Sequence, residues 1–246
     1  MRVGLFITCL ADLLRPSLAR AARTLLALTG AEVVVPRRQT CCGQPALNAG
    51  DPATTRALAL KLAREFADCD AVVLPSGSCA GTLRIHYPGL FAERPEAERR
   101  DIEALAARTH ELAEFLDTRL PEVPGRHAGR VTYHDSCSGL RELGVKQAPR
   151  ALLARVPGLE LVEMMNAEDC CGFGGTFALK YGAISAAICD RKCAAIRASG
   201  AGTVTGGDLG CLMHLAGRLQ RTGDTTTRVL HWAEIVAGTS GAQAWK

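Results

Sequence analysis

Cysteine pairs followed by glycine occur twice in this chain, about half a chain apart, and each pair has single cysteines at matching distances on either side. The two sets are Cys9, Cys41, Cys42 and Cys79 in the first half, and Cys137, Cys170, Cys171 and Cys211 in the second. Corresponding members are separated by 128, 129 and 132 residues. A spacing that drifts so little indicates an internal duplication of one cysteine-bearing unit.

Four thiols in each half suit a metal centre. Cysteine thiolates hold iron–sulfur clusters, usually with four ligands for each cluster. Zinc is the first alternative, but structural zinc sites favour two Cys-x-x-Cys pairs, and the chain has none. A disulfide between adjacent cysteines would be strained, so a dithiol–disulfide couple is the third interpretation. We expect all eight cysteines to bind iron–sulfur clusters of the 4Fe-4S type, with zinc as the alternative.

The other three of the eleven cysteines have no counterpart in the opposite half. They are Cys69, Cys189 and Cys193, and we expect them to be small core residues. The odd number of thiols and the lack of a recognisable signal peptide argue against a disulfide framework. We therefore expect a cytoplasmic protein.

Several polar residues near the second cysteine set are candidates for catalysis. His134 and Asp135 precede Cys137 and have no counterpart before Cys9, so they are candidates for proton transfer or for holding substrate. The alternative is a structural hydrogen-bonded pair. Arg141 and Lys180 are candidates to neutralise a carboxylate substrate or the charge of a cluster, the alternative being ordinary solvated side chains.

The cysteines follow short apolar segments that are typical of buried strands. Apolar runs at residues 3–7, 33–35 and 71–75 alternate with helical patterns that open at Pro16 and Pro52. This order predicts a parallel α/β architecture. Ligands in such sheets lie beyond the carboxyl ends of the strands. We therefore expect the four thiols of each half to converge at one edge of a sheet.

The same pattern restarts in the second half. Strand signals near residues 131–133, 159–163 and 203–205 alternate with helical patterns, the longest of which covers about 179–199. We predict two pseudo-symmetric parallel-sheet lobes, at residues 1–81 and 130–246. Residues 82–129 are expected to form a helical connection between them.

Charge and hydropathy exclude some classes of function. The chain has 246 residues and a net charge of +4, which is too mild to indicate binding to nucleic acid or to an anionic membrane. No apolar run approaches the roughly 20 residues that span a bilayer. The glycine-rich stretch at 172–175 has neither Gly-x-Gly-x-x-Gly nor a Walker lysine, so nucleotide binding is not expected.

The spacing of each cysteine set resembles the cysteine-rich CCG domain. The B subunit of heterodisulfide reductase and the glycolate oxidase iron–sulfur subunit belong to the same superfamily. That domain ends in Cys-x-x-Cys, whereas this chain has Ser76 and Asp208 in place of the first of those two cysteines. Ser76 and Asp208 are therefore possible oxygen ligands, or groups that polarise the site.

A closer resemblance, to the lactate utilization protein A family, covers nearly the whole chain. The segments that carry it are Phe6–Leu10, Gln39–Ala46, Pro75–Cys79, Tyr133–Cys137, Cys170–Phe177 and Asp208–Met213. It implies an oxidoreductase subunit of a multi-protein system that oxidises L-lactate, a small hydroxy acid, to pyruvate. The implied partners are a ferredoxin-like iron–sulfur protein and a third small subunit. The alternatives are a heterodisulfide-reductase-like thiol/disulfide redox subunit and a zinc-binding scaffold subunit.

Overall fold

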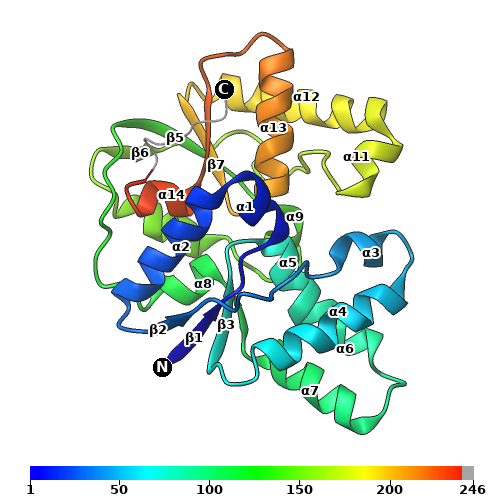
Figure 1. Ribbon diagram of the computed structural model, residues 1–246. Helices are drawn as coiled ribbons and strands as arrows, with labels where there is room; N and C mark the ends of the chain where they lie inside the picture. The colour runs from blue at the N-terminus through cyan, green and yellow to red at the C-terminus, as the bar shows by residue number, and fades with distance from the viewer. Residues whose placement is uncertain (240–246) are drawn as a thin grey trace.

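The strands form two parallel sheets with the same strand order. The computed structural model describes residues 1–239. The first sheet, in the order β2-β1-β3-β4, contains β1 (Arg2–Leu5), β2 (Glu32–Val34), β3 (Ala71–Leu74) and β4 (Thr109–Glu111). The second, in the order β6-β5-β7-β8, contains β5 (Gly129–His134), β6 (Leu159–Leu161), β7 (Thr203–Gly206) and β8 (Arg228–His231). This confirms the predicted duplicated α/β arrangement of two lobes (Figure 1).

The helices of the first lobe connect and cover its strands. They are α1 (Cys9–Leu14), α2 (Pro16–Leu28), α3 (Gln44–Asn48), α4 (Pro52–Glu65), α5 (Gly77–Gly81), the π-helical turn η1 (Thr82–His86), α6 (Tyr87–Leu90), α7 (Glu96–Ala107) and α8 (Leu112–Asp117). Helix α4 begins as its sequence predicts. Asp51 accepts a hydrogen bond of 3.0 Å from the backbone N–H of Thr54, and Pro52 occupies the first helical position.

The second lobe repeats this arrangement. Its helices are α9 (Cys137–Arg141), α10 (Gln147–Ala154), α11 (Thr176–Lys180), α12 (Gly182–Ala198), α13 (Leu209–Arg221) and α14 (Trp232–Val236). The long helix predicted over about 179–199 is α12, which begins at Gly182 because a turn separates it from the short α11. The chain turns at Tyr181, whose φ of −127° and ψ of 50° are not helical.

The segment 82–129 does more than connect the lobes. It supplies β4, which pairs in parallel with β3, and α8, which follows β4 directly. Strand β4 has no run of apolar β-branched residues, so periodicity gave no signal for it. The boundaries between the lobes stay a prediction.

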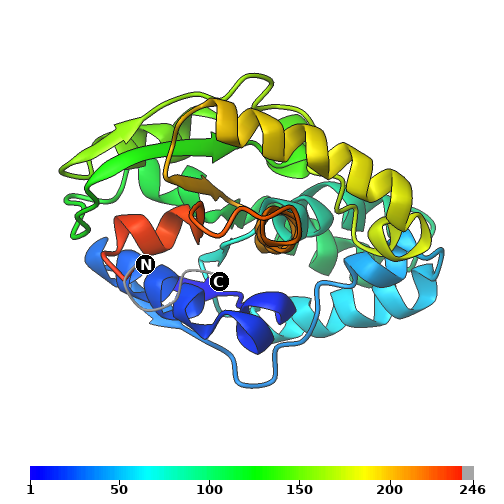
Figure 2. The ribbon, with the colours of Figure 1, turned by 90° about the horizontal axis from the view of Figure 1, so that it is seen from above.

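Each lobe ends in a short helix that packs on the opposite lobe. Helix α8 packs on α10, and α14 packs on α2, as Figures 1 and 2 show for the red α14 beside the blue α2. Trp232 and Phe115, from these two helices, lie in one buried cluster with Leu18 and Leu152. The lobes therefore share a hydrophobic core, which fixes the position of one cysteine set relative to the other. No helix within residues 1–239 has the length and apolar character needed to cross a bilayer.

Candidate functional site

The first cysteine set gathers at the carboxyl edge of its sheet. Cys9 begins α1, Cys41 and Cys42 follow β2 in a loop, and Cys79 lies in α5 just after β3. The Sγ atoms of Cys9 and Cys41 are 3.8 Å apart, and those of Cys42 and Cys79 are 3.3 Å apart. The fold therefore brings thiols from three separate segments together, as the parallel architecture predicts.

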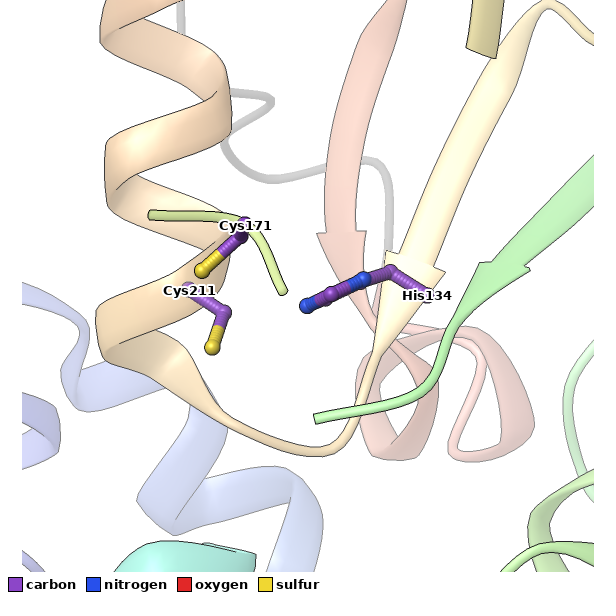
Figure 3. A group of neighbouring side chains, drawn as sticks. All are labelled: His134, Cys171 and Cys211. Carbon is purple, nitrogen blue, oxygen red and sulfur yellow. The ribbon is translucent and has the colours of Figure 1, made fainter. Parts of the chain in front are cut away.

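The second set has the corresponding positions. Cys137 begins α9, Cys170 and Cys171 follow β6, and Cys211 lies in α13. The thiols of Cys137 and Cys171 are neighbours of the Cys170 thiol and lower its pKa. The Sγ atoms of Cys171 and Cys211 lie within 4.8 Å of each other and of a ring nitrogen of His134 (Figure 3).

In each set one thiol is the preferred site of negative charge. Hydrogen bonds from Cys42 and Cys9, and from the N–H of Gly43, lower the pKa of Cys41 to about 2. Donation to Cys41 in turn raises the pKa of Cys9. Equivalent hydrogen bonds from Cys137, Cys171 and the N–H of Gly172 lower the pKa of Cys170 to about 2.

This pattern of pKa shifts bears on metal binding. Thiols that donate hydrogen bonds to a thiolate keep their protons, so these hydrogen bonds favour negative charge on Cys41 and on Cys170. Four neighbouring thiolates need a cation to offset their repulsion, and thiolates are the form that binds metal. The donor set of each lobe therefore fits a metal or iron–sulfur centre.

The two Cys-Cys-Gly turns depend on glycine. Gly43 and Gly172 have φ values of +79° and +88°, which favour glycine, and their N–H groups donate to Cys41 Sγ at 3.4 Å and Cys170 Sγ at 3.3 Å. A Cβ atom on Gly172 would lie 2.5 Å from the carbonyl oxygen of Ser185. These turns point backbone N–H groups at sulfur, which stabilises thiolate charge.

Two hydroxyl groups that sequence reasoning missed hold these turns in place. Thr55 Oγ1 shares its proton between the carbonyls of Asp51, at 2.9 Å, and Gly43, at 3.3 Å, and Ser185 Oγ donates to the carbonyl of Gly172 at 2.8 Å. Thr55 follows its glycine by 12 residues and Ser185 follows its own by 13. An alignment of the two halves that extended beyond the cysteines would have paired them.

Both sets border cavities between the lobes. A cavity of about 320 Å³ is lined by the four cysteines of the first set and by Phe173 and Leu179 of the second lobe. A second cavity, of about 410 Å³, is lined by Cys137 and Cys211 together with Gln44 of the first lobe, and Phe173 lines this one too. Each lobe therefore helps to enclose the thiols of the other.

Ser76 and Asp208 form a polar link between the lobes. Ser76 Oγ donates to Asp208 Oδ2 at 3.2 Å, and the backbone N–H of Ser78 donates to the same oxygen at 3.0 Å. Asp208 Oδ1 also accepts from the N–H of Gly210 at 3.2 Å, so this carboxylate caps helices of both lobes. Their role as metal ligands stays a prediction.

Asp135 is held in a buried ion pair that the sequence did not reveal. Its two carboxylate oxygens each accept a hydrogen bond of 2.8 Å from Arg150, which also donates to Glu163 at 2.6 Å. Such a bidentate pair is the strong, geometrically specific form of this interaction. It orients the backbone next to His134, and a role of Asp135 in proton transfer stays a prediction.

His134 is 1% exposed, and neither ring nitrogen has a hydrogen-bond partner. Burial, with a contribution from Lys192, lowers its pKa to about 3, so the ring is neutral at neutral pH. Arg141 and Lys180 are exposed at the ends of α9 and α11, and their contact with a carboxylate stays a prediction. Cys69, Cys189 and Cys193 are buried in apolar clusters, which confirms their assignment to the core.

The two parallel sheets have the same topology. Each has a cysteine, a Cys-Cys-Gly turn and a further cysteine at its carboxyl edge, and this repeated arrangement defines a tandem cysteine-rich protein. The profile of the family described as "CCG: Cysteine-rich domain" matches residues 3–84 and 131–216, one match in each lobe. The fold alone is also similar to that of a hypothetical protein from Helicobacter pylori, with a TM-score of 0.65 and 15% identity. That similarity covers 98% of this chain but only 49% of the other.

The sequence relatives are more specific. The chain is 45% identical over 238 residues to Lactate utilization protein A of Geobacillus thermodenitrificans, covering 96% of this chain and 98% of the relative. The protein of the same name from Geobacillus kaustophilus gives the same identity and coverage. The chain belongs to the lactate utilization protein A family.

Proposed function

We propose that this chain is an iron–sulfur electron-transfer subunit of a multi-protein system that oxidises L-lactate to pyruvate. The observation that carries the proposal is the matched pair of four-thiol sets, each gathered at the edge of a parallel sheet. Family membership supports lactate as the substrate of the system, because the relatives are named for lactate utilization.

Each lobe would hold one cluster. The ligands would be Cys9, Cys41, Cys42 and Cys79 in the first lobe, and Cys137, Cys170, Cys171 and Cys211 in the second. A 4Fe-4S cluster bound there supplies one-electron transfer. The N–H groups of Gly43 and Gly172 donate to ligand sulfurs, and such hydrogen bonds tune the reduction potential of a cluster.

The exposure of the thiols supports exchange of electrons with a partner. Cys9, Cys137 and Cys170 are exposed, whereas the other members of the two sets lie deeper in the protein. Each set therefore reaches from the protein interior to the surface. A ferredoxin-like iron–sulfur protein and a third small subunit are the proposed partners, and the exposed cysteines mark the surface that the electron-transfer partner would approach.

Binding of the hydroxy acid would use the cationic groups near the sets. Arg141 ends the helix that Cys137 begins, and Lys180 follows Leu179, which lines the cavity of the first set. Both are exposed and can neutralise a carboxylate. Whether lactate binds this subunit or a partner is decided by measuring lactate binding to the isolated chain and to the assembled system.

Anaerobic purification followed by metal analysis tests the proposal. We expect iron and acid-labile sulfide in comparable amounts, and a paramagnetic signal on reduction. Reduction by L-lactate is expected only when the partner subunits are present. A colourless protein that contains zinc in stoichiometric amount would refute the iron–sulfur assignment.

A zinc-binding scaffold is the second candidate function. The grouping of His134, Cys171 and Cys211 within 4.8 Å offers the nitrogen and sulfur ligands that structural zinc uses. The same metal analysis separates the two candidates, because zinc is not accompanied by sulfide and does not transfer electrons.

A further inference from the structure

The two lobes differ at one position beside the buried thiols. Phe6 and His134 each lie three residues before the first cysteine of their set. In the first lobe, Phe6 is fully buried in one cluster with Cys42 and Cys79 and packs edge-on against Phe66, with ring centroids 5.9 Å apart. In the second lobe, the corresponding place beside the corresponding thiols is taken by a histidine.

His134 differs from the other buried histidines in its hydrogen bonding. Within residues 1–239 it is the only histidine with both ring nitrogens buried and without a hydrogen-bond partner. By contrast, buried His231 uses its Nδ1 to accept from the N–H of Ala233 at 3.1 Å. Buried polar groups are nearly always paired, so a doubly unpaired imidazole calls for a partner that the polypeptide does not supply.

The ring of His134 lies beside the buried thiols of its lobe. His134 is the last residue of β5 and pairs with Gly206 of β7. The two strands are close together here, because a Cβ atom added to Gly206 would lie 3.0 Å from the backbone oxygen of His134. The ring points toward Cys171 and Cys211 (Figure 3), with a ligand nitrogen within 4.8 Å of both sulfurs. Imidazole and thiolate together are ligands of iron and zinc alike.

We propose that His134 binds the metal centre of the second lobe through a ring nitrogen, as a fifth protein ligand in addition to the four cysteines of that lobe and next to Cys171 and Cys211. The two lobes then hold chemically different centres, one with sulfur ligands only and one that includes a nitrogen ligand. The inference rests on the proposed function to the extent that the second lobe holds a metal. Because imidazole is neutral and thiolate is not, the second centre carries less negative charge than an equivalent centre with a further thiolate, which favours its reduction.

Pulsed electron paramagnetic resonance on the partly reduced chain tests this ligand. The chain is produced anaerobically with 15N-histidine, and its iron and sulfide are measured first. We expect a 15N coupling to the paramagnetic centre in the unsubstituted chain. The coupling should persist in Cys42→Ser, which disturbs only the first lobe.

Two substitutions of His134 make the test specific. His134→Phe introduces the residue that the first lobe has, and His134→Cys keeps a donor atom in place. We expect the 15N coupling to be lost in both and the iron content to be retained in His134→Cys. His214→Gln is the matched control, because His214 is half-buried in the same lobe, 3.2 Å from Ser185 Oγ, and we expect its substitution to leave the coupling unchanged.

The outcomes separate this inference from the proposed function. An iron-replete chain without 15N coupling, or a coupling that survives in His134→Cys, overturns the ligand assignment and leaves the proposed function standing. If the chain holds zinc, the iron–sulfur function fails. In that case the zinc-edge X-ray absorption spectrum of the unsubstituted chain is examined for scattering from imidazole. Scattering that is lost in His134→Cys supports His134 as a ligand, whereas a spectrum of the unsubstituted chain without imidazole scattering overturns the assignment.

Discussion

At the scale of single residues, the thiols of each set differ in depth. Cys9 and Cys137 are exposed, whereas Cys42 and Cys171 are at most 2% exposed. Charge is most costly where water is excluded. Cys42 and Cys171 therefore depend more strongly on a bound metal for their ionisation than the exposed cysteines do.

Substitution of these buried thiols should empty one lobe at a time. We expect Cys42→Ser and Cys171→Ser each to lower the iron content by about half, because each removes one of the four ligands of one cluster. The measurement is iron and sulfide per chain after anaerobic purification. Cys69→Ser is the control, since Cys69 is also buried and belongs to neither set. Full iron content in both ligand variants would show that the ligand sets are wrongly assigned.

At the scale of elements, each Cys-Cys-Gly turn positions two thiols because its glycine adopts the left-handed backbone conformation. Gly172 meets the carbonyl of Ser185 in α12, so the turn fits the helix only when no Cβ is present. We expect Gly172→Ala to lower the free energy of unfolding by about 3 kcal/mol, from backbone strain and the added contact. Gly144→Ala is the matched control, because Gly144 has a φ of +69° and open space around it. We expect this control to lower the free energy by about 1 kcal/mol.

Denaturant unfolding of the two variants, measured side by side, checks this prediction. The difference between them reports the contact with α12 alone, because both share the strain of a positive φ. Equal losses of stability in the two variants would mean that the turn adjusts around the new methyl group.

Helix α8 begins with a buried acid that makes stability depend on pH. Glu111 is fully buried and accepts from the N–H groups of Ala113 and Glu114, and burial raises its pKa from 4.5 to about 8. The folded chain therefore binds a proton that the unfolded chain releases between these two pH values. The contribution of Glu111 to stability is full below about pH 4.5 and is lost as the pH rises through 8.

Glu111→Gln should remove this dependence. We expect the free energy of unfolding of the unsubstituted chain to fall, relative to the variant, on the order of 3 kcal/mol between pH 5 and pH 8. Glutamine keeps an oxygen that accepts the capping hydrogen bonds and has no proton to release. Parallel pH profiles of the two proteins would contradict the raised pKa.

At the scale of the whole molecule, the exchange of terminal helices joins the lobes into one unit. Arg15 of the first lobe donates to both carboxylate oxygens of Glu234 in α14, each at 2.9 Å, and Ser17 Oγ donates to Glu234 at 2.7 Å. The backbone N–H of Gly77 also donates to the carbonyl of Gly207 across the lobes at 3.3 Å. The cavities that border both thiol sets exist only because these contacts hold the lobes together.

Glu234→Gln should weaken this junction. The substitution removes the charged partner of a buried ion pair, and we expect a loss of about 3 kcal/mol in the free energy of unfolding. Glu96→Gln is the control, because the ion pair of Glu96 with Arg100 is exposed, and this substitution should leave stability nearly unchanged. Thermal unfolding of both variants checks the prediction, and similar melting temperatures would contradict it.

Cysteine spacing and apolar segments were sufficient to predict the duplication, the parallel sheets and the edge at which the thiols gather. These features follow from local signals and from a general rule for parallel sheets. Strand β4 was not predicted, because Thr109, His110 and Glu111 are not a typical strand sequence and become one by pairing with β3.

The sequence by itself determined which residues offer chemistry, since eight thiols in two matched sets identify themselves by type and spacing. Only the tertiary structure decided what surrounds them. It joined Asp135 to Arg150, used Asp208 to cap helices of both lobes, and left the ring of His134 beside two thiols without a hydrogen-bond partner. Such pairings link segments that are distant in the chain, and they depend on how side chains fill a shared interior, which spacing along the sequence does not encode.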